Sequence, residues 1–349
     1  MITNPNVKIN LGLNILRKRE DGFHDLETLF VPYFGIHDTL EIITGDDYSR
    51  TSAALFAKYG EGVPAKQGTQ KPEGIFGVET NENDAPKIVQ GISEDGSLMI
   101  TIAREEGVDW DPLKDLCAKA YFILAEDFKL PPVKMFLEKT SPVGAGLGGG
   151  SADAAFTLTM LNEMCGLGLT RQQLAGYASR LGSDCAFFIY NRPMIGEGRG
   201  EILTEYDGHF CFSKNSSEPE PETDPDKAVY ELQVLAPAGV AVSTKEAYGG
   251  IRPHLPEQSL RDVLSRPVEE WKGLLVNDFE ETVFAKHPEL AAIKSSLYDS
   301  GAVYASMSGS GSALFAIYKS ENVRCAGIKK ITFSSKKEKC GKGGESHMQ

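Results

Sequence analysis

The sequence has no long hydrophobic run, no clustered cysteines and no excess of positive charge, and each absence excludes a class of protein. No stretch of the 349 residues approaches the roughly 18 apolar residues that a membrane helix requires. The start, MITNPNVKINLGL, lacks the basic residues, apolar run and cleavage site of a secretory signal. The six cysteines are scattered without a C-x-x-C pair, which argues against a zinc site or a disulfide framework. We therefore expect a protein of the reducing cytoplasm without a membrane partner.

The net charge of −13 argues against a general nucleic-acid-binding surface. The chain is 41% hydrophobic and 24% charged, as is typical of folded globular proteins. At 349 residues it exceeds one core of ordinary size, so we expect two lobes. If such an acidic protein binds an anionic ligand, it needs a few well-placed lysines, backbone N–H groups or a helix N-terminus.

The N-terminal segment carries the clearest strand pattern. Apolar and polar residues alternate from Val7 to Ile15, which predicts a half-buried strand. Lys8 and Asn10 fall on the same polar face of this strand. A glycine turn separates it from a second predicted strand over residues 26–31.

The remaining pattern alternates between helices, strands and polar loops. Helices are predicted over about 116–128, from near Ser151, and after the capping box Thr170–Gln173, which Gly182 can end. Strands are predicted over 133–137 and 313–318, and an apolar pattern resumes over 234–242. Polar, aperiodic segments are interpreted as hairpins and insertions over 45–97, a solvated acidic loop over 214–227 and a basic, disordered tail over 321–349.

The strongest local signal is a glycine-rich loop that leads into an apolar helix. Residues 142–155 read PVGAGLGGGSADAA, with five glycines in the seven positions 144–150. Glycine lets backbone N–H groups approach a phosphate, and the helix N-terminus that follows also attracts anions. A flexible linker would not lead directly into an apolar helix. The run lacks the βαβ context of a dinucleotide fingerprint and the Gly-Lys-Ser/Thr of a Walker A loop, so neither of those folds is indicated.

Three motifs together resemble those of the GHMP superfamily of small-molecule kinases. The glycine loop is similar to the second motif of the superfamily, PNVKINL at residues 5–11 to the first, and MSGSGSA at residues 307–313 to the third. The resemblance covers most of residues 1–320. It implies an α+β, two-lobed fold, with an N-terminal lobe like domain 2 of ribosomal protein S5 and a ferredoxin-like C-terminal lobe. The expected boundaries are 1–200 for the ATP-binding lobe, with the insertion at 45–97, and 201–320 for the second lobe.

One segment narrows the expected substrate. REDGFHDLET at residues 19–28 resembles the pattern by which diphosphocytidyl-methylerythritol kinases hold cytosine. In that family the histidine and its aromatic neighbour contact the base, which implies roles for His24 and Phe23. Tyr248 lies at the spacing of the family's second stacking ring, although it equally suits an ordinary half-buried tyrosine. An imidazole can hydrogen-bond a base edge while rings stack on its face.

The segment LGSDCAFF at residues 181–188 resembles the family's catalytic segment. The resemblance implies that Asp184 is the catalytic aspartate and Lys8 its partner, so we expect their charged groups within about 4–6 Å of each other. A helix-terminal aspartate making only a local Asx bond is the alternative. Lys139 matches a lysine near the adenine and ribose. Asp115 stands where the family usually has Asn, which adds negative charge near the nucleotide.

The resemblance also implies the ligands and the reaction. ATP and Mg²⁺ are the expected cofactors, and Ser151 is a candidate contact for the metal. Asn10 is expected to orient the cytidine-diphosphate-linked methylerythritol, whose 2-hydroxyl is phosphorylated in the non-mevalonate route to isopentenyl diphosphate. The expected ATP-binding residues are Lys139, Pro142, Val143, Gly144, Ala145, Gly146, Leu147, Gly148, Gly149, Gly150, Ser151 and Ala152. Gly309, Ser310 and Gly311 are expected to lie near the phosphates.

Two alternatives remain open at this point. Another GHMP kinase, acting on homoserine, mevalonate or a sugar, would share all three motifs, and only the Phe23–His24 segment and Tyr248 oppose it. A ligand sensor on the same fold would be expected to lack Lys8 or Asp184, and both are present. A purely structural protein would leave the glycine loop unexplained.

Overall fold

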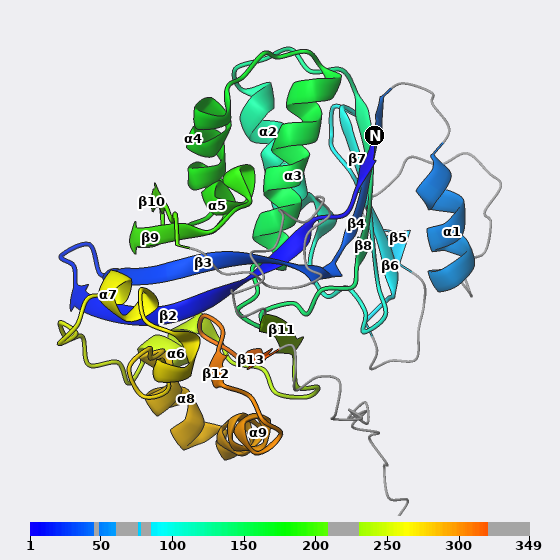
Figure 1. Ribbon diagram of the computed structural model, residues 1–349. Coiled ribbons are helices and arrows are strands. Elements are labelled where there is room, and N and C mark those ends of the chain that lie inside the picture. The colour runs from blue at the N-terminus through cyan, green and yellow to red at the C-terminus, as the bar shows by residue number, and fades with distance from the viewer. Residues whose placement is uncertain (45–48, 61–75, 78–84, 209–229, 320–349) are drawn as a thin grey trace, which may run out of the picture.

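The computed structural model describes residues 1–44, 49–60, 76, 77, 85–208 and 230–319, and Figure 1 shows their arrangement. The predicted acidic loop at 214–227 and the basic tail at 321–349 lie outside these residues, as does much of the segment 45–97.

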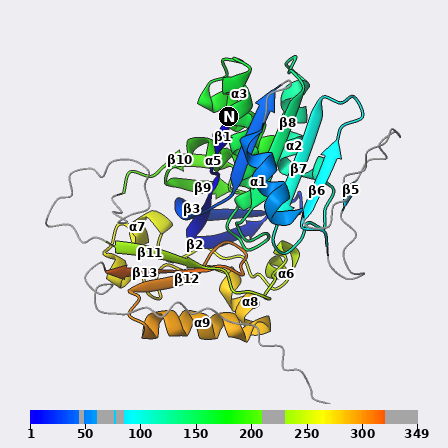
Figure 2. The ribbon, with the colours of Figure 1, turned by 90° about the vertical axis from the view of Figure 1, so that its right-hand side faces the viewer.

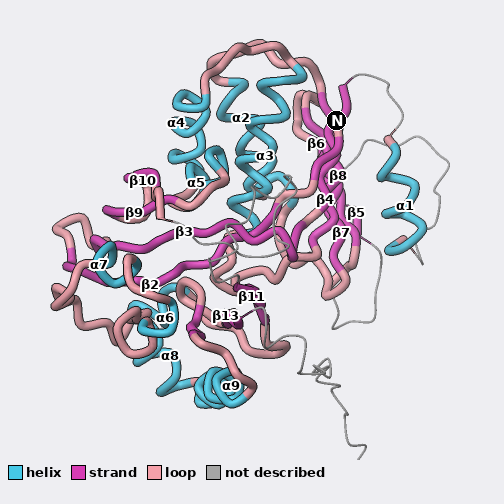
Figure 3. Tube along the Cα trace, viewed as in Figure 1, coloured by secondary structure: helices cyan, strands magenta, loops and turns pink. Residues whose placement is uncertain are grey.

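The N-terminal part contains a six-stranded sheet that carries helices on both faces. The strand order is β1 (Ile2–Thr3), β4 (Thr39–Thr44), β8 (Val133–Lys139), β7 (Leu98–Arg104), β6 (Ile88–Ile92) and β5 (Phe76–Gly77), with only β7 and β8 parallel among the described pairs. One face packs against α2 (Leu116–Ala125), α3 (Gly149–Met164), α4 (Arg171–Leu181) and α5 (Cys185–Tyr190), and this cluster is the largest apolar core. The helix α1 (Arg50–Tyr59) covers the opposite face, as Figure 3 shows.

A second sheet connects the two lobes. Its order is β10 (Ile202–Glu205), β9 (Met194–Gly198), β3 (His24–His37) and β2 (Asn6–Lys18), all antiparallel. Val7, Ile9 and Leu11 of β2 pack against Trp271, Tyr304 and Phe315 of the C-terminal lobe in one buried cluster. Burial of these side chains removes a large apolar area from water and joins the lobes.

The C-terminal lobe is a three-stranded antiparallel sheet backed by helices. Its strands lie in the order β11 (Tyr230–Leu235), β13 (Leu314–Lys319) and β12 (Tyr304–Met307). The helices are α6 (Thr244–Tyr248), α7 (Leu260–Leu264), α8 (Phe279–Lys286) and α9 (Pro288–Asp299), and Figure 2 shows α9 lying beneath the sheet. Short 3-10 helices at Pro112–Lys114 and Val268–Glu270 complete the described elements.

Most predicted elements are present, and the capping box is confirmed. Thr170 accepts from the Gln173 backbone, the Gln173 side chain accepts from the Thr170 backbone, and Gly182 ends the helix. The expected half-burial of β2 is wrong, because both of its faces are covered: Lys8 and Asn10 are each only 3% exposed. The interpretation of 45–97 as hairpins and insertions missed α1 and the sheet strand β6.

Candidate active site

The polar face of β2 contacts the glycine loop through Lys8. The Lys8 ammonium donates to the Asn10 side-chain oxygen at 2.5 Å and to the Gly146 carbonyl at 3.0 Å. The backbone N–H of Lys8 donates to the Leu147 carbonyl at 3.0 Å. Asn10 in turn donates from its amide to the Thr28 hydroxyl on β3 at 3.1 Å. The strand pair therefore holds the Lys8 ammonium against the loop, with the Asn10 side chain bonded beside it.

Lys8 also pairs with Asp184, although the two are far apart in the chain. The Lys8 ammonium lies 3.3 Å from Asp184 Oδ2, and the side chains are 3% and 30% exposed. Asp184 stands at the N-cap position of α5 and makes no side-chain capping bond within the described residues, so a local Asx bond does not explain its place. The expected proximity of the two charges is confirmed. Their catalytic roles stay a prediction.

The glycine loop follows a path that only glycine adopts readily. Gly144, Gly146 and Gly148 all have positive φ, between 72° and 78°. Ala145 and Leu147 alternate with these glycines, and their buried side chains anchor the loop in the core that joins the lobes.

The start of α3 completes a site for anions. The helix begins at Gly149 and has no side-chain cap among the described residues. Its first N–H groups are therefore available to an anion at the positive end of the helix dipole. Val143, Gly144 and Gly150 are exposed, so the outer surface of the loop is accessible. Pro142 precedes the loop and Ser151 and buried Ala152 follow it, and their expected contact with the nucleotide stays a prediction.

The third motif packs against the first two. The Ser308 hydroxyl accepts from the Asn10 backbone at 3.3 Å and donates to the Gly146 carbonyl at 3.1 Å. A methyl group added to Gly309 would meet the Gly146 carbonyl at 3.1 Å, so the two loops are in backbone contact. Asn277 holds this loop by donating to the carbonyls of Met307 and Gly309. Gly311 closes the loop's turn by donating to the Ser308 carbonyl, with half-buried Ser310 between them.

Two of the three predicted cytosine-binding residues, His24 and Tyr248, stack on each other. The rings of His24 and Tyr248 are 4.8 Å apart and 24° from parallel. Tyr248 also meets Phe279 edge to face at 4.8 Å. Burial and, to a lesser extent, the charge of Asp184 raise the pKa of Tyr248, which ties this cluster to the ion pair. Burial lowers the pKa of His24, which favours the neutral imidazole.

Phe23 stands apart from this stack. Its ring is 55% exposed, and the Arg199 guanidinium lies 5.1 Å from the ring centroid. Arg199 occupies the tip of the β9–β10 hairpin, between two glycines of positive φ. One face of Phe23 is therefore covered by a cation that the motif did not predict.

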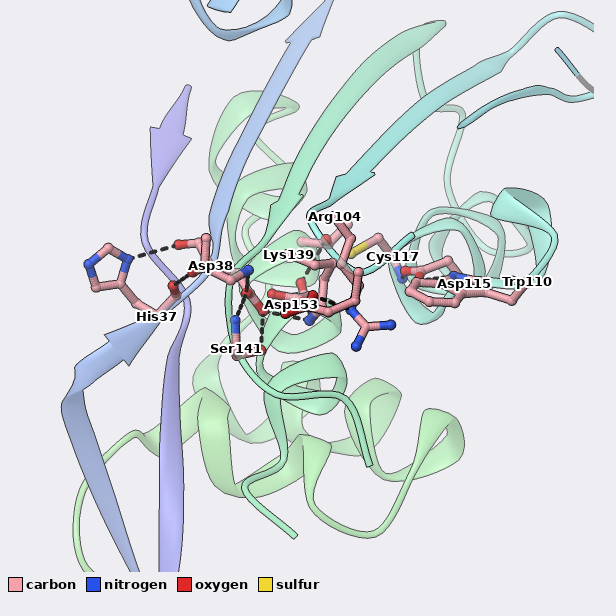
Figure 4. A network of polar contacts seen from close by, with 12 residues as sticks. His37, Asp38, Arg104, Trp110, Asp115, Cys117, Lys139, Ser141 and Asp153 are labelled. Atoms are coloured by element: carbon pink, nitrogen blue, oxygen red, sulfur yellow. Dashed lines mark hydrogen bonds and ion pairs between the residues drawn. The ribbon is translucent and has the colours of Figure 1, made fainter. Parts of the chain in front are cut away.

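Lys139 lies among the buried side chains of Asp38, Ser141 and Asp153, as Figure 4 shows. Its ammonium lies 2.5 Å from Asp38 Oδ2 and 2.5 Å from Asp153 Oδ2, and its side chain is 4% exposed. Burial lowers the pKa of Lys139, but the two carboxylates outweigh burial and raise it overall. Two of its three N–H donors are directed at these carboxylates. Its expected contact with adenine and ribose stays a prediction.

Asp115 has a structural use for both of its oxygens. It caps α2 by accepting from the Cys117 backbone at 2.9 Å, and it accepts from the Trp110 indole N–H at 3.1 Å (Figure 4). The two donors contact different oxygens, and Asn would place an N–H₂ group against one of them, so Asn could not satisfy both donors. The second oxygen of the carboxylate at this position therefore serves as the acceptor for the Trp110 indole N–H.

The residues present suit a magnesium ion that is shared with a nucleotide. The described residues hold no cluster of three or more His, Cys, Asp or Glu side chains with the geometry of a metal site. Mg²⁺ commonly binds through one or two protein oxygens and substrate phosphates, so such a cluster is not required. The Ser151 hydroxyl lies on the first turn of α3 beside the Cys185 thiol, whose pKa burial raises to about 12. Ser151 and Asp184, which precedes Cys185, are the residues whose side-chain oxygens could bind Mg²⁺ there.

Several residues that build the site carried no readable signal in the sequence. Asp38, Arg199 and Asn277 are single polar residues outside any motif. Trp110 had one available clue, since an indole five residues before an unusual aspartate needs an acceptor when it is partly buried. Among the described residues, none of the helices has the length and apolar character needed to cross a bilayer.

Comparison with known proteins agrees with this geometry. The family profile of the GHMP kinases N terminal domain matches residues 115–192, and that of the GHMP kinases C terminal matches residues 260–326. The crystal structure of a 4-(cytidine 5'-diphospho)-2C-methyl-D-erythritol kinase has a TM-score of 0.60 at 24% identity and covers 93% of this chain and 92% of its own. A mevalonate kinase has a TM-score of 0.53 at 11% identity, with 93% of each chain covered. The predicted GHMP kinase fold is confirmed.

Sequence relatives are closer than these structures. A 4-diphosphocytidyl-2-C-methyl-D-erythritol kinase of Bacteroides fragilis is 39% identical over 321 residues, covering 92% of this chain and 93% of the relative. That of Bacteroides thetaiotaomicron is 40% identical, and that of Cytophaga hutchinsonii 34% identical, with the same coverage. The chain therefore belongs to the GHMP kinases and, among them, to the family of the 4-diphosphocytidyl-2-C-methyl-D-erythritol kinases.

Proposed function

We propose that this chain transfers the terminal phosphoryl group of ATP to the 2-hydroxyl of 4-diphosphocytidyl-2-C-methyl-D-erythritol. The product is the 2-phosphate, which serves isopentenyl diphosphate synthesis by the non-mevalonate route. Family membership supports the substrate, and the free thiols of Cys117, Cys165 and Cys185 agree with a cytoplasmic location. The observation that best supports phosphoryl transfer is the Lys8–Asp184 ion pair, which lies against the glycine loop and leaves the Asp184 side chain 30% exposed.

The glycine loop and the start of α3 supply the phosphate site. Backbone N–H groups there neutralise charge without a side chain that would keep the phosphates away. Phosphoryl transfer passes through a loose transition state, so the protein contributes mainly positioning and charge stabilisation. A bound Mg²⁺ would neutralise charge on the phosphate oxygens, with Ser151 as its protein contact.

Asp184 orients the acceptor hydroxyl and accepts its proton. Its exposed fraction leaves the carboxylate open to a substrate, while Lys8 is buried behind it. The Lys8 ammonium also donates to the Gly146 carbonyl, so its charge lies at the loop where negative charge develops on the transferred group. Asn10 supports Lys8 on the same strand face and orients the substrate.

The cytidine end of the acceptor binds at the His24–Tyr248 stack and Phe23. A planar base placed between two rings needs them about twice the usual stacking distance of ~3.5 Å apart, whereas the His24 and Tyr248 centroids are 4.8 Å apart. The base therefore either stacks on the outer face of the pair or separates the two rings. Neutral His24 offers one donor and one acceptor to a base edge.

The test is a coupled assay of ATP consumption with three acceptors: the cytidyl-diphosphate substrate, homoserine and mevalonate. Only the cytidine-containing acceptor should support efficient turnover, and phosphorus NMR of the product should place the new phosphate on the 2-oxygen. Faster turnover of homoserine or mevalonate would make the chain another kind of GHMP kinase. Binding of the cytidyl substrate without turnover of any acceptor would favour a ligand sensor.

A further inference from the structure

A buried polar cluster joins the two ends of the glycine loop. It consists of Asp38, Lys139, Ser141 and Asp153, and we name it the loop clasp (Figure 4). Asp38 lies between β3 and β4, Lys139 and Ser141 lie where β8 runs into the loop, and Asp153 lies in the first turns of α3. All four residues are at most 5% exposed, so the cluster does not face a ligand directly.

Asp38 is the most fully bonded member of the clasp. Its Oδ1 accepts from the backbone N–H groups of Thr140 and Ser141, both at 2.7 Å. Its Oδ2 accepts from the Ser141 hydroxyl at 2.7 Å and from the Lys139 ammonium. Burial opposes ionisation, but Lys139 and these donors together lower the pKa of Asp38. Asp38 thus holds the chain at the point where it enters the loop.

Asp153 is bonded quite differently. Its Oδ2 accepts from Lys139, but its Oδ1 has no hydrogen-bond partner among the described residues, although the side chain is 1% exposed. The carboxylate therefore uses only one of its two oxygens. Lys139 links it to Asp38, so a single ammonium connects the loop entrance to the helix that follows the loop.

Gly149 shows how closely the two loop ends approach. A methyl group placed on this first residue of α3 would overlap the Ser141 hydroxyl and lie 3.5 Å from the Lys139 ammonium. At the adjacent Gly150 the nearest atom would be 3.8 Å away, on Leu116. The start of α3 is therefore seated directly on the clasp, and this contact requires glycine at 149.

We propose that the loop clasp is a positioning device for the nucleotide, in which Asp38 holds the glycine loop in its binding shape and Asp153 only accepts a hydrogen bond from the shared Lys139 ammonium. The proposal rests on the proposed function in one respect, that this loop binds the phosphates of ATP. A glycine-rich loop loses much conformational entropy when it is ordered. Fixing both of its ends before the nucleotide arrives reduces that cost at binding.

Two isosteric variants separate the roles of the carboxylates. Asp38→Asn leaves one acceptor oxygen for four donors and turns an amide N–H₂ toward other N–H groups, so the loop entrance is released. Asp153→Asn keeps an oxygen for Lys139 and puts the amide where the unpartnered oxygen lies. Glu138→Gln is the matched control, because Glu138 is the neighbour of Lys139 on β8 but pairs with Lys58 and Tyr59 in the last turn of α1.

Hydrogen exchange of residues 140–152 in the nucleotide-free protein is the first readout. Exchange should be faster in Asp38→Asn and unchanged in Asp153→Asn and Glu138→Gln. The second readout is kinetic: KM for ATP should rise about tenfold or more in Asp38→Asn, with kcat at saturating ATP and KM for the acceptor within about threefold of wild type. A merely structural role would lower thermal stability without this division between substrates.

Wild-type loop protection and KM for ATP in Asp38→Asn would overturn the proposal. Equal damage from Asp153→Asn would overturn the distinction between the two carboxylates. If Asp38→Asn does not fold, Ser141→Ala removes one donor to Asp38 and should raise exchange and KM for ATP in the same direction, and an unchanged loop would again overturn the clasp. If the wild type consumes no ATP with any acceptor, the proposed function fails, while exchange and calorimetric ATP affinity still decide the role of the clasp.

Discussion

Two buried lysines flank the glycine loop, and their partners differ in exposure. Lys8 pairs with Asp184, which is 30% exposed, whereas Lys139 lies between Asp38 and Asp153, which are 0% and 1% exposed. Gly148 approaches the Lys8 side and Gly149 approaches the Lys139 side, so both lysines reach the same short segment. One pair is open to a substrate, and the other is sealed.

The difference teaches how similar charges acquire different tasks. A carboxylate that is partly open can accept a proton from a ligand, while a sealed carboxylate can only hold its neighbours. Removing one member of a sealed pair leaves an uncompensated buried charge. We therefore expect changes at Lys8 or Asp184 to act on turnover, and changes at Asp38 or Gly149, on the Lys139 side, to act on ATP binding and stability.

The largest effect is expected from the open pair. Asp184→Asn keeps the shape of the side chain but cannot accept a proton, so kcat should fall by about 10²–10⁴. Lys8→Ala should cause a comparable loss, because the charge beside the Gly146 carbonyl disappears. Steady-state kinetics with the cytidyl acceptor and Mg-ATP would measure both.

The double variant tests whether the open pair acts as one unit. Lys8→Ala combined with Asp184→Asn should be little worse than either single change. Strictly additive losses would mean that the two residues work independently. The Glu138→Gln variant, which breaks an ion pair with exposed Lys58, serves as the control and should leave kcat unchanged.

Replacement of His24 sharpens the comparison by acting on the acceptor alone. His24→Ala removes a base contact worth about 1–3 kcal/mol, so KM for the acceptor should rise about 5- to 150-fold. KM for ATP should stay within about twofold, because His24 begins β3 and Asp38 of the clasp follows the other end of that strand. Tyr248→Phe keeps the ring and is the control. A change mainly in KM for ATP would show that the two substrate regions are assigned wrongly.

The motifs predicted the open side of the site better than the sealed side. Lys8, Asn10, His24 and Asp184 could be placed because each lies in a segment with a strong local pattern. The burial of the polar face of β2 could not be read from alternation, since period two says which residues share a face and not what covers it. The clasp was missed because Asp38 is far from the loop in sequence and only the pairing of β4 with β8 brings it there.

The adjacent glycines 149 and 150 probe the sealed side. Gly149→Ala forces a methyl group against the Ser141 hydroxyl and should destabilise the fold by about 1–3 kcal/mol and raise KM for ATP. Gly150→Ala meets its nearest atom only at 3.8 Å and should be neutral or stabilising by up to ~1 kcal/mol. Thermal melts of both variants would measure the difference. Equal stability would mean that α3 does not depend on its contact with the clasp.

The smallest effect is expected at Asp115, which adjoins the sealed side. Asp115→Asn keeps a good cap for α2, but its single oxygen cannot serve both the Cys117 backbone and the Trp110 indole. The lost bond should cost about 1 kcal/mol of unfolding free energy, measured by denaturant titration. Trp110→Phe removes the same bond from the other end together with some indole packing, so the shared bond should appear as a coupling of about 1 kcal/mol in the double-variant cycle. KM for ATP should change less than about threefold, because the carboxylate faces these two donors. A large drop in KM for ATP would instead mean that the Asp115 charge repels the nucleotide directly, and the division between an open and a sealed side would then have to be redrawn at α2.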